Sequence, residues 1–283
     1  MSGLPDTSGQ SGTSGHSGSE PAPCRVLIES APNSGIRNMA IDEVLLETAL
    51  ATGQMQIRWY RWDRATLSLG YFQPEADPLE TSQTRELPRV RRLSGGGAIL
   101  HHHEWTCSFA LPPDHPLALE PGNLYEAVHR QIVAFLNRAG VPATMRRDAV
   151  TGSMAGQTAA EPFLCFGRGD PRDIVLHGHK IVGSAQRRRK GAVLQHGSLL
   201  LDRSPAAPEF PGIRDLVPGF QFHLPEAAEL AARFLEELTG QPTEGTPRSD
   251  SLTAAELLRV DELATSRYAR LQWHRRANRT ELP

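Results

Sequence analysis

Apolar residues recur at helical spacing in NMAIDEVLLETALATG, a stretch that opens at Asn38 and carries its apolar stripe from Met39 onward. Gly53 follows this stretch and tolerates the left-handed conformation in which helices commonly end. The same spacing in NLYEAVHRQIVAFLNRAG predicts a second helix, which starts at Asn123 and closes at Gly140. Two helices are therefore predicted in the first half of the chain.

The C-terminal part also has helical spacing. PEAAELAARFLEELTG predicts a helix that stops at Gly240. Thr253 and Glu256 then have the spacing of a capping box, in which each residue satisfies a backbone amide of the other. The apolar run LLRVDELATSRYARLQW behind this box predicts one last helix.

Alternating apolar residues between these helices predict strands. Short β-branched and aromatic runs, bounded by glycine or proline, occur in CRVLIES, IRWYRW, ATLSLGYFQ, PRVRRLSGGGAILHHHEWTCSFALP, RDIVL, HKIVGSAQRR and GAVLQHGSLLL. Strands with helices between and after them indicate an α+β domain: a mixed β-sheet flanked by helices.

Composition divides the chain into three parts. Residues 1–23 are rich in serine and glycine and have too little apolar surface to offset the entropy of ordering, which predicts a disordered tail. Residues 24–222 are predicted to form the folded domain, and residues 223–283 to form helices packed on it. The tail lacks the apolar core of a signal peptide, and no apolar run approaches the ~20 residues that span a bilayer.

The charge and cysteine content narrow the class of protein. A formal net charge of -2 gives no support for binding to nucleic acid or to a membrane surface. Cys24, Cys107 and Cys165 have spacings that fit neither a disulfide framework nor a zinc site. We expect a cytoplasmic protein, in a reducing compartment, and a monomer.

RRLSGGGAILHHHE contains the first candidate site. Gly95, Gly96 and Gly97 remove every Cβ from a turn between strands, so that backbone amides can approach an anion or a carbonyl. Arg91 and Arg92 place positive charge just ahead of this turn. A hairpin loop with solvated arginines explains the same residues equally well.

The run from His101 to His103 resembles a metal cluster. Successive side chains of a strand point to opposite faces, so these three cannot all bind one ion. No other cysteine or histidine pair has zinc spacing, and we predict no metal site. A structural or substrate-contacting histidine is the favoured interpretation.

GHKIVGSAQ places Lys180 in an apolar strand. An ammonium in such surroundings must be paired with an opposite charge or lose its proton, unless it has a functional role. Gly183, further along, keeps the strand open to a bound chain. An exposed lysine on an edge strand is the alternative.

Cys165 falls in a loop just before this strand, and a thiolate near an ammonium is favoured as a nucleophile. A buried inert thiol is the alternative for Cys165, and the interpretation we adopt for Cys107.

NMAIDEVLL, SLGYFQ, RRLSGGGAILHHHE and DIVLHGHKIVGSAQRRRKGAVLQHGSLLL, in this order, resemble the lipoate and biotin protein ligase catalytic family. The resemblance covers residues 28–202 and implies a fold like that of class II synthetases. It also implies an acyl-chain tunnel walled by SGGGA, from Ser94, and by the lysine strand, with Ser184 and Ala185. The lysine of the K-x-x-G-x-A motif is Lys180, which is implied to hold the acyl carbonyl.

The resemblance also implies the type of reaction. In one branch, octanoyltransferases take octanoate from acyl carrier protein through a cysteine in a loop before the lysine strand, where Cys165 stands. Ligases use ATP and Mg²⁺ instead, and usually carry Asn-Asp where this chain has GDPRDI. The complete SGGGA resembles ligases, and His102 and Glu104 make that segment a mixture. The C-terminal helices are too short for the accessory domain of a ligase.

We therefore expect an octanoyltransferase of lipoate assembly with Cys165 and Lys180 as catalytic residues and no required cofactor. The expected partners are acyl carrier protein as donor and, as acceptor, the lipoyl-carrier domains of dehydrogenase subunits or the glycine-cleavage protein. The alternatives are an ATP-dependent lipoate-protein ligase and a non-catalytic acyl-binding domain. The substrate-binding residues we expect are Arg91, Arg92, Ser94, Gly95, Gly96, Gly97, His101, Gly183, Ser184 and Ala185.

Overall fold

The computed structural model describes residues 24–75, 80–149, 163–243, 245 and 247–275. Its large sheet has seven strands, in the order β1 (Cys24–Ile28), β2 (Met55–Tyr60), β6 (Glu104–Leu111), β10 (Ala192–Leu200), β9 (His179–Arg189), β8 (Ile174–Leu176) and β7 (Thr144–Met145). β1 and β2 are parallel, and the other neighbours in this sheet are antiparallel. The predicted mixed sheet of an α+β domain is confirmed.

A smaller sheet holds the segment around the three glycines. β3 (Thr66–Leu69) lies between β4 (Arg89–Arg91) and β5 (Ile99–His101). It is parallel to β4 and antiparallel to β5. The glycine segment therefore crosses the end of β3 and does not form a hairpin between adjacent strands.

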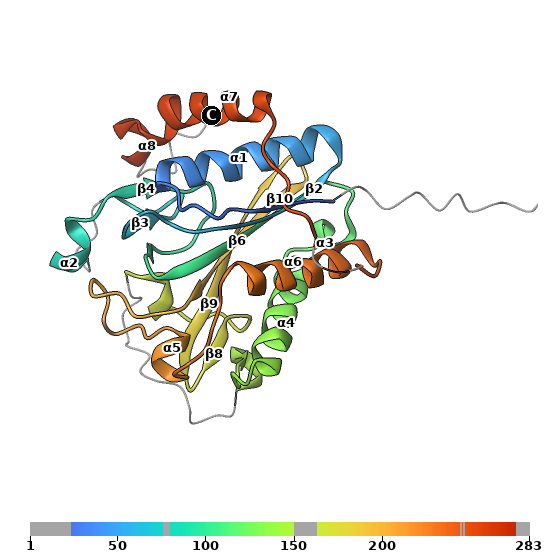
Figure 1. Ribbon diagram of the computed structural model, residues 1–283. Helices are drawn as coiled ribbons and strands as arrows, with labels where there is room; N and C mark the ends of the chain where they lie inside the picture. Colours follow the sequence, from blue (N-terminus) through green and yellow to red (C-terminus); the bar gives the residue numbers. More distant parts are fainter. Residues whose placement is uncertain (1–23, 76–79, 150–162, 244, 246, 276–283) are drawn as a thin grey trace, which may run out of the picture.

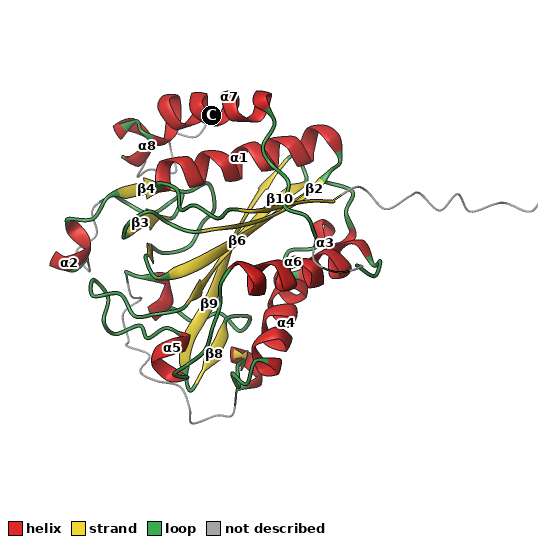
Figure 2. Ribbon diagram, viewed as in Figure 1, coloured by secondary structure: helices red, strands yellow, loops and turns green. Residues whose placement is uncertain are grey.

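Helices cover both faces of the large sheet (Figure 1, Figure 2). α1 (Gly35–Thr52) and α7 (Ala254–Leu263) share one apolar cluster, and α4 (Asn123–Arg138) and α6 (Leu224–Thr239) pack into another. Because both faces are covered, every residue of the central strands β6 and β10 is buried. Polar side chains on these strands must therefore find partners inside the protein.

The helix ends follow the sequence closely, with one correction. α1 begins at Gly35, not at the predicted Asn38, because the Ser34 hydroxyl accepts the Arg37 amide and caps a helix that starts earlier. Gly53 ends α1 with a φ of 72°, and Gly240 ends α6 with a φ of 67°, as predicted. The start of α4 at Asn123 is also confirmed.

The last predicted helix is wrong as one continuous helix. Thr253 and Glu256 form the expected capping box of α7, but Ala264–Tyr268 winds as a π-helical turn and α8 (Leu271–His274) follows separately. The break brings the Tyr268 hydroxyl to 3.0 Å from Glu43 Oε2. Tertiary contacts with α1 thus override the helical periodicity of this segment.

Three short helices complete the fold: α2 (Ser82–Arg85), α3 (Pro116–Leu119) and α5 (Ile213–Leu216). The predicted tail, residues 1–23, lies outside the described residues. In the described part of the chain, no helix combines the length and apolar character that crossing a membrane requires.

Candidate active site

Cys165 and Lys180 lie side by side in the structure. Cys165 opens a single 3-10 turn, Cys165–Gly167, which is tied to the glycine segment by the Cys165 amide, 2.6 Å from the Ala98 carbonyl oxygen. Lys180 Nζ lies 3.2 Å from the Cys165 carbonyl oxygen and 3.9 Å from its Sγ. The ammonium is thus within reach of both the thiol sulfur and the backbone carbonyl oxygen of Cys165.

A buried carboxylate holds the Lys180 ammonium in this place. Asp173 Oδ1 is 2.9 Å from Lys180 Nζ, and both side chains are only 5% exposed. Asp173 Oδ2 also accepts the amide of Asp170, at 2.7 Å. Asp173 was not among the residues predicted from the sequence, although a lysine in an apolar strand needs a partner and this acidic residue directly precedes β8.

A β-bulge directs Lys180 to the site. Val175 pairs with Lys180 while the adjacent Ile174 pairs with Val182, so the ladder skips Ile181. Strict alternation would place residues 180 and 183 on opposite faces, and the extra residue brings them to the same face. A Cβ on Gly183 would lie 2.4 Å from Lys180 Cε and 2.8 Å from Nζ. Gly183 therefore leaves room for the lysine side chain.

Replacing Gly183 with alanine should push the lysine out of place. Because moving the ammonium also weakens its buried ion pair with Asp173, we expect a loss of stability of about 1 to 3 kcal/mol and a loss of activity of about 10-fold or more. Thermal unfolding and turnover with an acyl thioester measure the two effects. Gly197→Ala is the matched control, because its Cβ would meet Ser184 Oγ at 2.3 Å on the opposite face. Equal activity losses in both variants would contradict this role of Gly183.

Two of the three glycines, Gly96 and Gly97, have a structural reason to be glycine. Gly96 has a φ of 90°, in the region that side chains disfavour. A Cβ on Gly97 would lie 2.7 Å from the Arg168 guanidinium, whereas one on Gly95 would meet no atom within 4 Å. The segment is shaped by its close approach to Arg168 and to the Cys165 turn.

The position of Arg91 differs from the predicted contact with a substrate. Its side chain is fully buried and donates to backbone carbonyls. The acceptors are the carbonyl oxygens of Gly70, Tyr71, Gln73, Trp273 and His274. Arg91 therefore fastens the C-terminal segment to β4 and does not face a ligand.

Arg92 is also buried, and it holds the glycine segment through hydrogen bonds to its backbone. Its guanidinium donates to the carbonyl oxygens of Gly95 and Gly97, at 2.6 and 2.7 Å. Burial lowers the pKa of Arg92 to about 10, while the charge of Cys165 acts in the opposite direction. Arg92 thus stays positive at neutral pH within electrostatic reach of the thiol, and it acts through the loop and through its charge rather than as a direct contact.

A chain of buried polar contacts leads from α1 to this loop. The Ser94 hydroxyl lies 2.5 Å from His196 Nε2 and 3.2 Å from Arg92 Nε. His196 Nδ1 faces Asp42 Oδ2 at 3.4 Å, and since a carboxylate only accepts, Nδ1 carries the hydrogen and Nε2 accepts from Ser94. Burial by itself raises the pKa of Asp42, but the His196 hydrogen bond and the charge of Arg58 outweigh it and lower that pKa. Neither Asp42 nor His196 was among the residues predicted from the sequence.

The histidine run also needs correction. His102 and His103 lie in the turn between β5 and β6, where their rings stack with centroids 3.6 Å apart, so the alternation argument does not apply to them. His101 stacks on Trp62 and its Nδ1 is 2.7 Å from Glu104 Oε1. It is buried by these contacts, which argues against the predicted substrate contact. Among the described residues, no three potential metal ligands gather at one point.

Ser184 and Ala185 point in opposite directions from β9. Ser184 Oγ is 2.7 Å from His129 Nε2 beneath α4, on the face away from Gly183 and Lys180. This orientation corrects the prediction of a substrate contact by the Ser184 side chain. Ala185 lies opposite His196 in the sheet and faces the same side as Gly183.

The chain is similar to known proteins that agree with one another in family. Residues 34–208 match the model of the lipoyl protein ligase A/B catalytic domain. Octanoyltransferase LipM of Brevibacillus brevis is 33% identical over 275 residues, 89% of this chain and 98% of the relative. Octanoyltransferase LipM of Moorella thermoacetica is 39% identical over 188 residues, 64% of this chain and 66% of the relative.

Solved structures share the fold. Lipoate-protein ligase A bound with ATP superposes with a TM-score of 0.68 at 21% identity, over 90% of this chain and all of that one. A bipartite lipoate protein ligase from Thermoplasma acidophilum gives a TM-score of 0.64 at 19% identity, over 93% and 100%. These likenesses show the architecture that the sequence resemblance implied.

Proposed function

Because the chain belongs to the family of the lipoyl protein ligase A/B catalytic domain, we propose that it is an octanoyltransferase of lipoate assembly. The acyl group moves from a thioester on acyl carrier protein to Cys165, and from Cys165 to the lysine of a lipoyl-carrier domain. The observation that carries this proposal is the Cys165 thiol, 3.9 Å from the Lys180 ammonium. The reaction takes place in the reducing cytoplasm, where such a thiol remains free.

The first half of the reaction forms an acyl-enzyme. Cys165 Sγ attacks the thioester carbonyl carbon, a new carbon–sulfur bond forms, and the bond to the carrier sulfur breaks. The carrier thiolate takes the proton that Cys165 gave up. Lys180 Nζ donates to the carbonyl oxygen as negative charge develops there, and Asp173 keeps the ammonium in position.

The second half restores the thiol. The acceptor amine attacks the same carbonyl carbon, a carbon–nitrogen bond forms, and the bond to Cys165 Sγ breaks. A proton of the amine returns to the sulfur. Since the energy of the thioester is retained until the amide forms, the transfer needs neither ATP nor Mg²⁺. An ATP-dependent ligase is the alternative, and the curated relatives support it less than the transferase.

Intact-mass spectrometry tests this proposal. Incubation with octanoyl-acyl carrier protein, without ATP, should give one octanoyl adduct that maps to Cys165, and a lipoyl domain should then remove it. Product from free octanoate and ATP, formed equally well by Cys165→Ala, would instead establish the ligase.

A further inference from the structure

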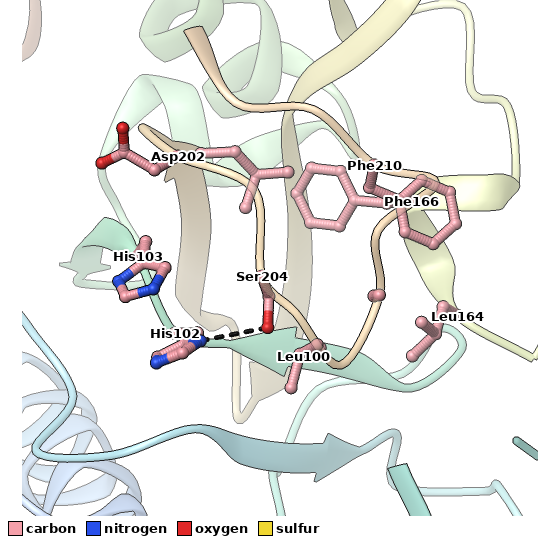
Figure 3. Close-up of a pocket in the computed structure, with 10 residues that line it drawn as sticks. Leu100, His102, His103, Leu164, Phe166, Asp202, Ser204 and Phe210 are labelled. Carbon is pink, nitrogen blue, oxygen red and sulfur yellow. Dashed lines mark hydrogen bonds between the residues drawn. The ribbon is translucent and has the colours of Figure 1, made fainter. Parts of the chain in front are cut away.

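The Lys180 ammonium lies between an aromatic wall and hydrogen-bonding groups. The Phe166 ring is 5.4 Å from Lys180 Nζ and packs beside the Phe210 ring, as Figure 3 shows. A ring attracts an ammonium over a range of positions and does not fix one of them. The position of Lys180 Nζ therefore depends on its directional contacts, which are the Cys165 carbonyl oxygen and the Asp173 carboxylate.

Asp173 belongs to a tight turn, residues 170–173, that closes on itself. The Asp173 amide donates to the Asp170 carbonyl oxygen at 3.0 Å, and Asp173 Oδ2 accepts the Asp170 amide at 2.7 Å. Asp170 Oδ1 accepts both the amide and the side-chain Nε of Arg172, each at 2.9 Å. These bonds give the turn its internal shape. They do not determine how the turn lies against β9, the strand that carries Lys180.

Contacts with two other parts of the chain place the turn. The amides of Arg146 and Arg147 donate to carbonyl oxygens of the turn, at 2.7 and 3.0 Å. His129 reaches the turn from α4, where its Nδ1 lies 2.6 Å from the Arg172 carbonyl oxygen. The amide contacts exist whatever residues stand at those positions, whereas this contact from α4 requires the ring of His129.

The surroundings of His129 decide which of its nitrogens carries hydrogen. A carbonyl oxygen only accepts, so Nδ1 carries the hydrogen and donates to Arg172. Burial lowers the pKa of His129, so the ring is neutral and Nε2 accepts from the Ser184 hydroxyl at 2.7 Å. Ser184 belongs to β9, as does Lys180. The buried ring thus joins the strand of the lysine to the turn that holds Asp173.

We infer that His129 is a positioning residue for the acylation of Cys165. By joining β9 to the turn, it keeps Asp173 Oδ1 at 2.9 Å from the Lys180 ammonium. The inference rests on the proposed function and adds a residue to it. Because Ser184 faces away from Lys180 on β9, His129 acts through the turn and not by contact with the ammonium.

Two amide side chains in place of the ring separate its two contacts. Asparagine puts its nitrogen at the position of Nδ1 and can still donate to the Arg172 carbonyl, whereas glutamine reaches the position of Nε2, next to Ser184. We expect His129→Gln to slow Cys165 acylation about 5-fold at saturating octanoyl-acyl carrier protein, with the half-saturating concentration changed less than about twofold. His129→Asn should restore most of that rate. Single-turnover acylation, followed by intact mass, measures both constants.

A second variant and a second background sharpen the test. His129→Leu adds no polar group that needs a partner, so it serves if His129→Gln folds poorly, and it should show the same loss. In the Asp173→Asn protein, either substitution should add less than about twofold, because the ion pair that His129 maintains is already weakened. His115→Gln is the matched control, since His115 is also buried and bonds the Leu238 carbonyl oxygen through Nε2. It should lower the unfolding temperature and leave acylation unchanged.

Several results would overturn the inference while wild-type Cys165 still forms the octanoyl adduct. They are wild-type rates in His129→Gln and His129→Leu, equal losses in His129→Gln and His129→Asn, or a full further loss in the Asp173→Asn background. A loss of acylation in His115→Gln as large as in His129→Gln would also overturn it, because general destabilisation would then explain both. If wild-type Cys165 accepts no octanoyl group, the proposed function fails first and this inference fails with it.

Discussion

Cys165→Ala is expected to lower octanoyl transfer by at least about 10³-fold, because no other group on that turn can carry the acyl intermediate. The loss should appear in kcat and in kcat/KM alike, since the thiol reacts in the step that both constants contain. The measurement is steady-state transfer from octanoyl-acyl carrier protein to a lipoyl domain.

Cys107→Ala is the matched control for this experiment. Cys107 is fully buried in β6, where burial raises the pKa of its thiol to about 12, so it remains an inert apolar residue. This variant should keep wild-type activity. Activity retained by Cys165→Ala, or lost equally by Cys107→Ala, would remove Cys165 from the mechanism.

Lys180→Met is expected to lower the rate of Cys165 acylation by about 10² to 10³-fold, the usual effect of removing one donor to a developing oxyanion. Methionine keeps the length and apolar stem of lysine but has no charge and no hydrogen to donate. Single-turnover acylation, followed by mass, isolates this step from transfer to the lipoyl domain.

Asp173→Asn supplies the internal comparison. It keeps the ammonium but weakens the 2.9 Å ion pair that positions it, so we expect a smaller loss, about 10-fold. If Asp173→Asn were as damaging as Lys180→Met, the pair would act as one unit. If Lys180→Met were harmless, the lysine would have no role in polarising the carbonyl.

Local signals in the sequence predicted most of the fold. Glycines that adopt the left-handed conformation, and the Thr253–Glu256 box, depend on residues close in sequence, and their positions were predicted correctly. The π-helical turn at Ala264–Tyr268 was not, because it forms where Tyr268 meets Glu43, a contact between distant parts of the chain. Periodicity cannot register such a contact.

The candidate site divides in the same way. The sequence pattern brought Cys165, Lys180 and Gly183 into one hypothesis, and the structure brings them together. The sequence pattern could not distinguish a guanidinium that faces a ligand from one whose hydrogen-bond donors are all directed to backbone carbonyls. Arg91 and Arg92 donate to backbone carbonyls. The sequence also gives no signal of a β-bulge. The pairing of β8 with β9 is therefore needed to explain why residue 183 is a glycine.

The position of Arg91 also bears on how the protein is made. Its buried guanidinium needs the carbonyls of Trp273 and His274, which the ribosome adds 182 and 183 residues later. Until they emerge, the strand that leads into the glycine segment carries a charge lacking these acceptors, which is costly to bury. The catalytic face is therefore completed only after residues 273 and 274 have left the ribosome, and until then the nascent chain holds its cysteine in an unfinished pocket.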